Sequence, residues 1–197
     1  MPHIGRLLTA SRHQAITEVL PERLEFYESW LRSETVRERG FGMAPMSAVL
    51  GFLRTEPLYS RVMARAGALA AEWTIASMPP MRRRGIGLLP RPCRVRAALR
   101  VAARIVREIC SVSRASARVR RTGARLDVRA SLFCTVRQLL PLPLCGFYVA
   151  VAASTLEGFG LPGKARVERC HAVDGQSCVI ALDLSRTDAA SDPAIAA

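Results

Sequence analysis

The chain of 197 residues contains almost no lysine and very little histidine. Lys164 is its one lysine, so 28 of its 29 basic residues are arginine. Its histidines are His3, His13 and His171, which leaves few imidazoles that can act as a general base. The glycine pairs of the chain lack the pattern of a phosphate-binding loop, and no serine–histidine–aspartate arrangement is evident. The sequence therefore contains no familiar hydrolase or nucleotide-binding motif.

Long apolar runs are absent as well. The longest mostly apolar stretch, residues 139–156, is broken by prolines and hydroxyl side chains, so no uninterrupted run reaches the roughly 18 to 20 residues of a membrane span. The N-terminus lacks the charged region, apolar core and small-residue cleavage site of a secretion signal. We therefore expect no membrane span and a cytoplasmic location, where cysteines are mostly reduced thiols.

Acidic residues are outnumbered, and the formal net charge is +13. The replacement of lysine by arginine, together with abundant alanine, is typical of a bacterial GC-rich genome. Aromatic residues make up 6% of the chain and are scarce in the basic stretches, so no stacking platform for bases is visible. We do not expect a nucleic-acid partner. A basic amphipathic helix predicted over 92–112 leaves an anionic membrane surface or nucleic acid as the alternative.

Periodicity divides the chain into helices followed by strands. Half of the residues are apolar, which is enough for a core. Apolar residues at helical spacing predict helices over 15–31, 45–53, 58–77, 92–112 and 145–156. Alternation with a period of two predicts hairpins over 113–132 and 164–184. The predicted fold class is α+β, with helices packed on one face of a small antiparallel sheet made of two hairpins.

The ends and one internal segment are expected to lie outside this framework. We predict a mobile basic arm over 1–14, a single α+β domain over 15–184 and a disordered tail over 185–197. Residues 78–92, with four prolines and a run of three arginines, are predicted to form a flexible loop.

Cysteines in the last third of the chain carry the clearest chemical signal. Asp174-Gly175 predicts a hairpin turn, which would place Cys170 opposite Cys178 with side chains about 5 Å apart on one face. Glu168 stands two residues before Cys170 and would share that face. Cys145 offers a third thiol just upstream. Thiolates with a carboxylate or an imidazole can hold Zn²⁺ in a closed, structural site. Buried uncoordinated thiols and a Cys170–Cys178 disulfide are the alternatives.

The remaining cysteines suggest other roles. Cys134 follows a predicted strand and could face the interior. Paired with His171, either Cys134 or Cys145 would be a candidate catalytic nucleophile. Cys93 and Cys110 lie on or beside the basic helix and are expected to have no special function.

Several short segments resemble the 4-vinyl reductase domain family. They are Ser131–Cys134, Cys145, Gly158–Gly160, Val167–Cys170 and Asp174–Cys178. The closing motif of that family is a Glu shortly before a Cys, then Gly and a second Cys, and the resemblance extends over roughly the last 85 residues. The family shares its fold with subunits of the TRAPP trafficking complexes, in which helices lie over an antiparallel sheet.

In the sensor members of that family a zinc ion is held by one Glu and three Cys. The resemblance transfers this ligand set to Cys145, Glu168, Cys170 and Cys178. Glu168 stands one residue closer to Cys170 than the family motif has it, and His171 is the alternative ligand.

The resemblance also implies a function. It predicts a sensor-like domain that binds an apolar aromatic or tetrapyrrole-like ligand between helices and sheet, and a homodimer. Trp73, Phe147 and Tyr148 are candidate ligand contacts. An enzyme or accessory factor is the first alternative, either in tetrapyrrole vinyl reduction or as a thiol-dependent hydrolase of the L-2-amino-thiazoline-4-carboxylic acid hydrolase type. A partner-binding scaffold is the second alternative.

Overall fold

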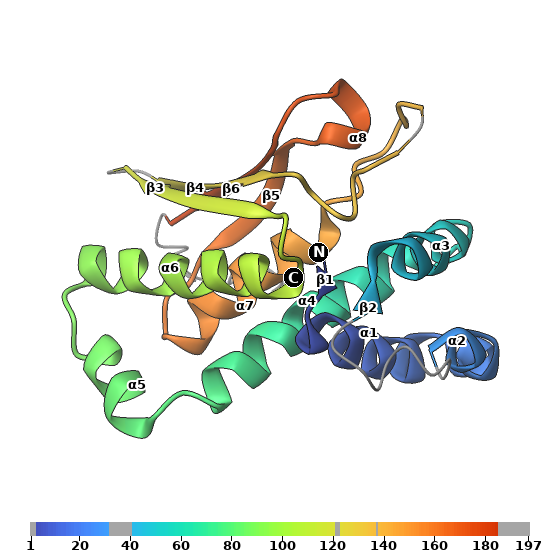
Figure 1. Ribbon diagram of the computed structural model, residues 1–197. Coiled ribbons are helices and arrows are strands. Elements are labelled where there is room, and N and C mark those ends of the chain that lie inside the picture. The colour runs from blue at the N-terminus through green and yellow to red at the C-terminus, as the bar shows by residue number, and fades with distance from the viewer. Residues whose placement is uncertain (1–2, 32–40, 121–122, 137, 185–197) are drawn as a thin grey trace, which may run out of the picture.

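A four-stranded antiparallel sheet lies over helices, as the sequence predicts (Figure 1). The computed structural model describes residues 3–31, 41–120, 123–136 and 138–184, with the backbone alone for residues 29–31 and 41–45. The helices in these residues are α1 (Arg6–Val19), η1 (Pro21–Arg23), α2 (Leu24–Leu31), α3 (Met43–Leu53), α4 (Tyr59–Ala76), α5 (Pro80–Gly87), α6 (Arg91–Ile109), α7 (Gly146–Gly158) and α8 (His171–Asp174). The strands are β1 (His3–Ile4), β2 (Phe41–Gly42), β3 (Arg114–Val119), β4 (Gly123–Arg129), β5 (Lys164–Arg169) and β6 (Cys178–Asp183).

The main sheet has the strand order β3-β4-β6-β5. The two predicted hairpins, β3–β4 and β5–β6, are joined because β4 pairs with β6 in the centre, with Leu126 opposite Ile180 and Val128 opposite Cys178. This central pairing is the long-range contact that periodicity could not predict. The strands β1 and β2 form a separate short antiparallel pair.

Helices cover one face of the sheet and leave the other open (Figure 1). The covering helices are α6 and α7, with α4 packed against α7 and α1 against α4. Leu126, Val128 and Ile180 point into the buried face. Their neighbours along the strands, such as Arg125 and Arg129, are exposed, so the alternation of the sequence maps onto the two faces of the sheet. The predicted apolar stripe of α6 is likewise buried.

The pairing of α4 with α7 depends on small residues. A Cβ atom at Gly67 would lie 2.3 Å from the carbonyl oxygen of Phe147 and 2.9 Å from the Cβ of Ala150. Glycine therefore lets the two helix backbones approach at this point. The many alanine and glycine residues of α4, which predict close helix packing from the sequence, allow this approach.

The predicted mobile arm over residues 1–14 is wrong for its described part. Residues 6–19 form α1, whose Leu8 and Ile16 are fully buried against the core, and Ile4 pairs with Phe41 through β1 and β2. The apolar side chains at positions 4, 8 and 16 are buried and anchor this segment. The basic residues between them made the segment look polar in the sequence. The predicted tail over 185–197 lies outside the described residues.

The predicted loop over 78–92 is also incorrect, because residues 80–87 form α5. Pro80 occupies the first turn of that helix. Backbone amides in the first turn have no partner within the helix, so the missing N–H of proline costs no hydrogen bond there. Among the described helices, none is both long and apolar enough to cross a lipid bilayer.

Candidate metal centre

Four cysteines that are far apart in the sequence meet at one end of the sheet. The Sγ atoms of Cys134, Cys145, Cys170 and Cys178 all lie within 4.8 Å of one another, and each of the four residues is at most 2% exposed. We call these four residues the cysteine cluster. In sequence they span 45 positions. Cys134 lies in the turn after β4, Cys145 and Cys170 directly precede α7 and α8, and Cys178 is the first residue of β6.

Two members of the cluster are helix N-caps. Cys145 precedes α7, and its carbonyl oxygen accepts hydrogen bonds from the amides of Tyr148 and Val149. Cys170 precedes α8, and its carbonyl oxygen accepts from Val173 and Asp174. The positive end of the backbone dipoles at the N-terminus of α7 favours negative charge at Cys145 once a cation offsets the repulsion among the four sulfurs. The short helix α8 replaces the tight turn predicted at Asp174-Gly175.

Cys134 and Cys178 are held by the central strand pair. Cys178 is the first residue of β6 and lies opposite Val128 near the end of β4. Beyond β4, Ala130 has a φ of 51°, a left-handed conformation that costs about 1 kcal/mol in a residue other than glycine. This bend turns the chain into the segment that carries Cys134 back beside Cys178.

The sulfur spacing fits a single tetrahedral ion. The Sγ–Sγ distances are 3.3 Å for Cys134–Cys145, 3.5 Å for Cys134–Cys170 and 3.2 Å for Cys145–Cys170. Four thiolates bound to one zinc ion at about 2.3 Å would lie about 3.8 Å apart. A larger iron–sulfur cluster distributes its thiolates over several iron atoms, which requires a wider cage. All six cysteines of the chain are free thiols, so the alternative of a Cys170–Cys178 disulfide is not found in this structure.

Backbone amides donate hydrogen bonds to two of the sulfurs. The amide of Leu144 lies 3.4 Å from the Sγ of Cys170, and the amide of His171 lies 3.4 Å from the Sγ of Cys178. Such amide–sulfur bonds stabilise thiolate ligands around a metal. Hydrogen bonds from Cys134 and from Cys145 lower the pKa of the Cys170 thiol, whereas hydrogen bonding to Cys134 raises the pKa of Cys145. Without a cation, four thiols this close therefore cannot all be ionised.

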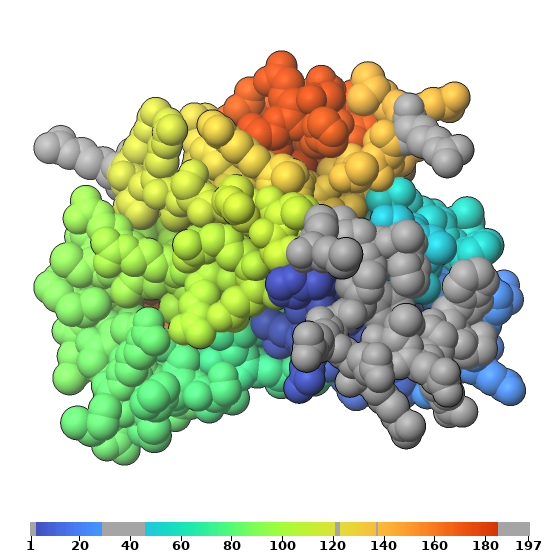
Figure 2. Space-filling model, viewed as in Figure 1, coloured from blue at the N-terminus to red at the C-terminus, as the bar shows by residue number. Residues whose placement is uncertain are grey.

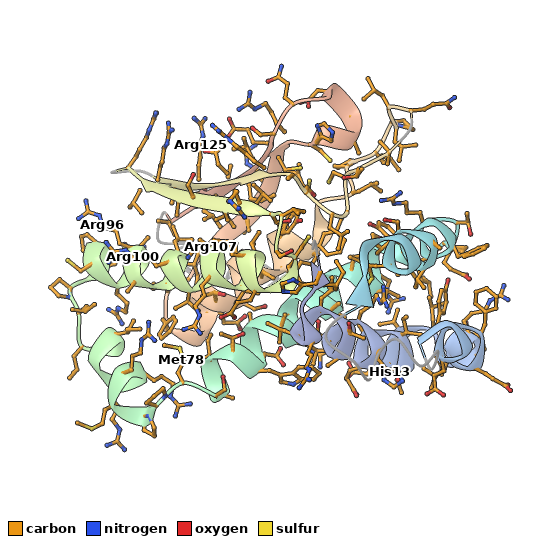
Figure 3. The ribbon with its side chains drawn as sticks, viewed as in Figure 1. His13, Met78, Arg96, Arg100, Arg107 and Arg125 are labelled. Carbon is orange, nitrogen blue, oxygen red and sulfur yellow. The ribbon has the colours of Figure 1, made fainter. Side chains whose placement is uncertain are left out.

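The structure does not bring Glu168 to the cluster. A register shift between Val167 and Arg169 interrupts the pairing of β5 with β6. Because this bulge adds one residue, Glu168 and Cys170 point to opposite faces instead of sharing one. The Glu168 carboxylate binds Arg125 through two contacts of 2.8 and 2.7 Å on the open face of the sheet. Figure 3 shows Arg125 pointing away from the helices on that face. Cys134 supplies the fourth ligand atom of the group in its place.

His171 also lies outside the group, although it follows Cys170 directly. Its Nδ1 donates a hydrogen bond to the carbonyl oxygen of Gln176 at 3.0 Å, and its ring is exposed. Among the described residues, His171 makes no side-chain hydrogen bond to Cys134 or Cys145. The geometry of a thiol–imidazole nucleophile is therefore missing.

The three predicted ligand contacts do not form one site. Phe147 and Tyr148 are fully buried and pack with Phe133, at ring-centroid distances of 4.8 and 5.2 Å. Trp73 is 37% exposed near the end of α4. Phe147 lies level with Gly67, whereas Ile75, two residues from Trp73, contacts Gly158 at the other end of α7. The length of α7 therefore separates Trp73 from the other two.

Two hollows in the surface lie elsewhere. The larger, of about 600 Å³, opens on the free face of the sheet and is lined by arginines that include Arg118, Arg129 and Arg166. The smaller, of about 270 Å³, lies between the end of β4 and α8, next to the cysteine cluster, and is lined in part by Ser131 and His171. Neither is lined by the three predicted ligand contacts.

Sequence reasoning missed Cys134 as a member of the group. What brings Cys134 to the group is the pairing of β4 with β6, because the chain that leaves β4 then passes the start of β6, where Cys178 lies. This pairing is visible in the structure and not in the sequence. Hairpin patterns predict each strand pair by itself and contain no information on how two hairpins join.

The arrangement is chemically suited to hold a metal and not to activate water. All four positions of a tetrahedral ion would be taken by protein thiolates, which leaves no open position for substrate. Such an ion would join the loop after β4, the start of α7 and the β5–β6 hairpin. The comparisons with known proteins add no relative, since no protein-family model matches the chain and no curated protein is similar to it in sequence.

Proposed function

We propose that the cysteine cluster binds one structural zinc ion and that the chain is a sensor-like, small-molecule-binding domain of the 4-vinyl reductase type. The convergence of four buried Sγ atoms within 4.8 Å carries the zinc part of this proposal. Buried cysteines are common, but four that converge on one point are the donor set of a closed Cys₄ zinc site. Zinc would stabilise the fold at the junction of α7 with the two hairpins.

The ligand part is supported by two buried hydroxyl groups whose hydrogen bonding is incomplete. The hydroxyl groups of Tyr59 and Tyr148 are inaccessible to solvent and form no well-aligned hydrogen bond among the described residues, although Arg54 lies near the first and Ser131 near the second. Burial raises the pKa of Tyr148 well above its ordinary value, so its hydroxyl stays protonated. A small aromatic ligand that entered from the smaller hollow, which Ser131 lines, would bring a hydroxyl or carbonyl group toward Tyr148 and complete its hydrogen bonding. A homodimer remains a prediction from the family resemblance.

Metal analysis tests the zinc part. We expect about one zinc per chain in protein purified without chelator or His-tag, and in the control Cys93→Ser, whose thiol is exposed on α6. Cys178→Ser should lose the metal and melt at a much lower temperature. Cobalt substituted for zinc should give the intense thiolate charge-transfer absorption of a tetrahedral S₄ site. Wild-type protein without bound metal would refute the zinc site.

Thermal shifts test the ligand part. Phenol and a free-base porphyrin are suitable probes, because one is a small aromatic and the other a tetrapyrrole. A ligand that binds only the folded state raises the melting temperature, by an amount that grows with the logarithm of ligand concentration above the dissociation constant. The shift should shrink in Tyr148→Phe and persist in Tyr27→Phe, which removes a hydroxyl that already contacts Glu56 at 3.4 Å. If neither probe shifts the wild type, the ligand part is wrong while the zinc part stands.

A further inference from the structure

The helix α5 forms a corner of the molecule that combines exposed apolar side chains with unpaired arginines. The chain leaves α4 near Met78, turns outward through α5 and returns in α6 (Figures 1 and 3). In the space-filling view this turn forms an edge of the surface (Figure 2). We call Met81, Arg82, Arg83, Arg84 and Leu88 the α5 corner.

The apolar residues of the corner face solvent. Met81 is 81% exposed and Leu88 is 87% exposed. Met81 lies in α5, and Leu88 follows its last residue with an amide still bonded to the carbonyl oxygen of Arg84. Seven residues make two helical turns, so the two side chains lie on the same side. Gly85 lies between them on that side, and a Cβ atom there would meet nothing within 4 Å. Ile86, the buried residue of α5, points the other way and fixes the helix to the molecule. Two large apolar side chains are thus presented outward on a held helix.

Positive charge surrounds these apolar residues. Arg82, Arg83 and Arg84 are all exposed, and none forms an ion pair within the described part of the chain. No Asp or Glu occurs anywhere from residue 73 to residue 107, so the sequence around the corner contains no acid that could neutralise it. Isolated exposed apolar residues are normal on a protein surface. At the α5 corner two such residues stand beside three arginine side chains that form no ion pair within the described part of the chain.

We propose that the α5 corner binds the surface of a membrane that contains acidic phospholipids. Arginine side chains would contact the lipid phosphates, and Met81 and Leu88 would enter the boundary between headgroups and acyl chains. Nucleic acid would use the arginines but would leave the two apolar side chains in water. A second copy of the same corner would bring arginine against arginine. An acidic lipid surface would bind the arginines and also remove the two apolar side chains from water. This proposal does not depend on the zinc or ligand sites.

Vesicle flotation tests the proposal with the full, metal-loaded chain. One vesicle is phosphatidylcholine alone and the other is phosphatidylcholine with phosphatidylglycerol in equal parts. We expect binding to the acidic vesicles, weakened by added salt, and at least about tenfold weaker binding to the neutral ones. The variants R82Q/R83Q/R84Q and M81S/L88S should each weaken binding to acidic vesicles by about tenfold or more.

A matched control removes the same charge elsewhere. R118Q/R120Q/R166Q lies on the open face of the sheet, where these arginines are exposed, and its binding should stay within about twofold of wild type. All variants change exposed side chains, and unchanged melting temperatures would establish that they fold. The proposal is overturned if the two arginine triples weaken binding equally, because net charge alone would then explain it.

Two further outcomes would also overturn it. If M81S/L88S binds acidic vesicles as wild type does, and duplex DNA binding falls in R82Q/R83Q/R84Q alone, the corner is a nucleic-acid surface. If sedimentation shows that M81S/L88S converts a wild-type dimer to a monomer, the corner is an interface between copies of this chain. Absence of binding to either vesicle in wild type contradicts the proposal directly.

Discussion

The cysteine cluster and the α5 corner depart from ordinary protein surfaces and cores in opposite ways. The cluster buries four ionisable thiols at one point, and the corner exposes two large apolar side chains among three arginines. Four buried thiols need a cation to balance their charge once they ionise, whereas exposed apolar side chains lose less free energy to water when another surface covers them. The cysteine cluster therefore concerns the stability of the fold, and the α5 corner concerns binding to a partner surface. Substitutions should therefore affect stability at the cluster and binding at the corner.

Cys134→Ser should have the largest effect on stability. If Cys134 is the fourth zinc ligand, its loss should lower the free energy of unfolding by at least about 3 kcal/mol. The difference from wild type should vanish when both proteins are unfolded in excess chelator, because neither then holds metal. Denaturant unfolding with and without chelator measures this. Cys134→Ser protein that retains full zinc and stability would exclude Cys134 as a ligand.

Gly67→Ala should have an intermediate effect that does not depend on metal. Its Cβ would lie 2.3 Å from the carbonyl oxygen of Phe147, so α4 and α7 must move apart, at a cost of about 2–3 kcal/mol. The matched change on α5 is Gly85→Ala, where a Cβ meets open space and should stabilise the helix by up to about 1 kcal/mol. Thermal unfolding of both variants compares a packed glycine with an exposed one. Equal effects would show that α4 and α7 can separate at Gly67 without loss of stability.

Glu168→Gln should have the smallest effect. The substitution weakens the half-exposed pair with Arg125, which is worth no more than about 0.5 kcal/mol. Zinc content and the cobalt absorption spectrum should not change, because the carboxylate lies on the face of the sheet opposite the cysteines. Loss of metal in this variant would restore the ligand set that the family resemblance implies, with Glu168 in place of Cys134.

Much of the fold could be predicted because it is encoded by local periodicity. The alternation from Arg114 to Val119 and from Gly123 to Arg129 predicted the β3–β4 hairpin, and the apolar stripe of α6 predicted a helix with one buried side. The mobile arm and the proline-rich loop were mispredicted, because basic residues and prolines masked the few apolar positions that anchor α1 and α5. Those positions stabilise a helix only when the core is present to cover them.

The candidate site was predicted in part. The sequence identified Cys145, Cys170 and Cys178, because a hairpin places Cys170 beside Cys178 and a helix start lies close by. It misplaced Glu168, because a single-residue bulge reverses the face of every side chain beyond it. It gave Cys134 another role, because nothing local indicates which strand lies next to β4.

The sequence by itself determined the class of the fold, the two hairpins, the basic charge and the presence of thiols suited to zinc. The tertiary structure decided which four side chains meet, which carboxylate faces away and which helix exposes its apolar side. Periodicity records what each segment prefers along its own axis. The convergence of Cys134 with Cys178 depends instead on the pairing of β4 with β6, a contact between residues about fifty positions apart in the chain that only the closure of the whole core establishes.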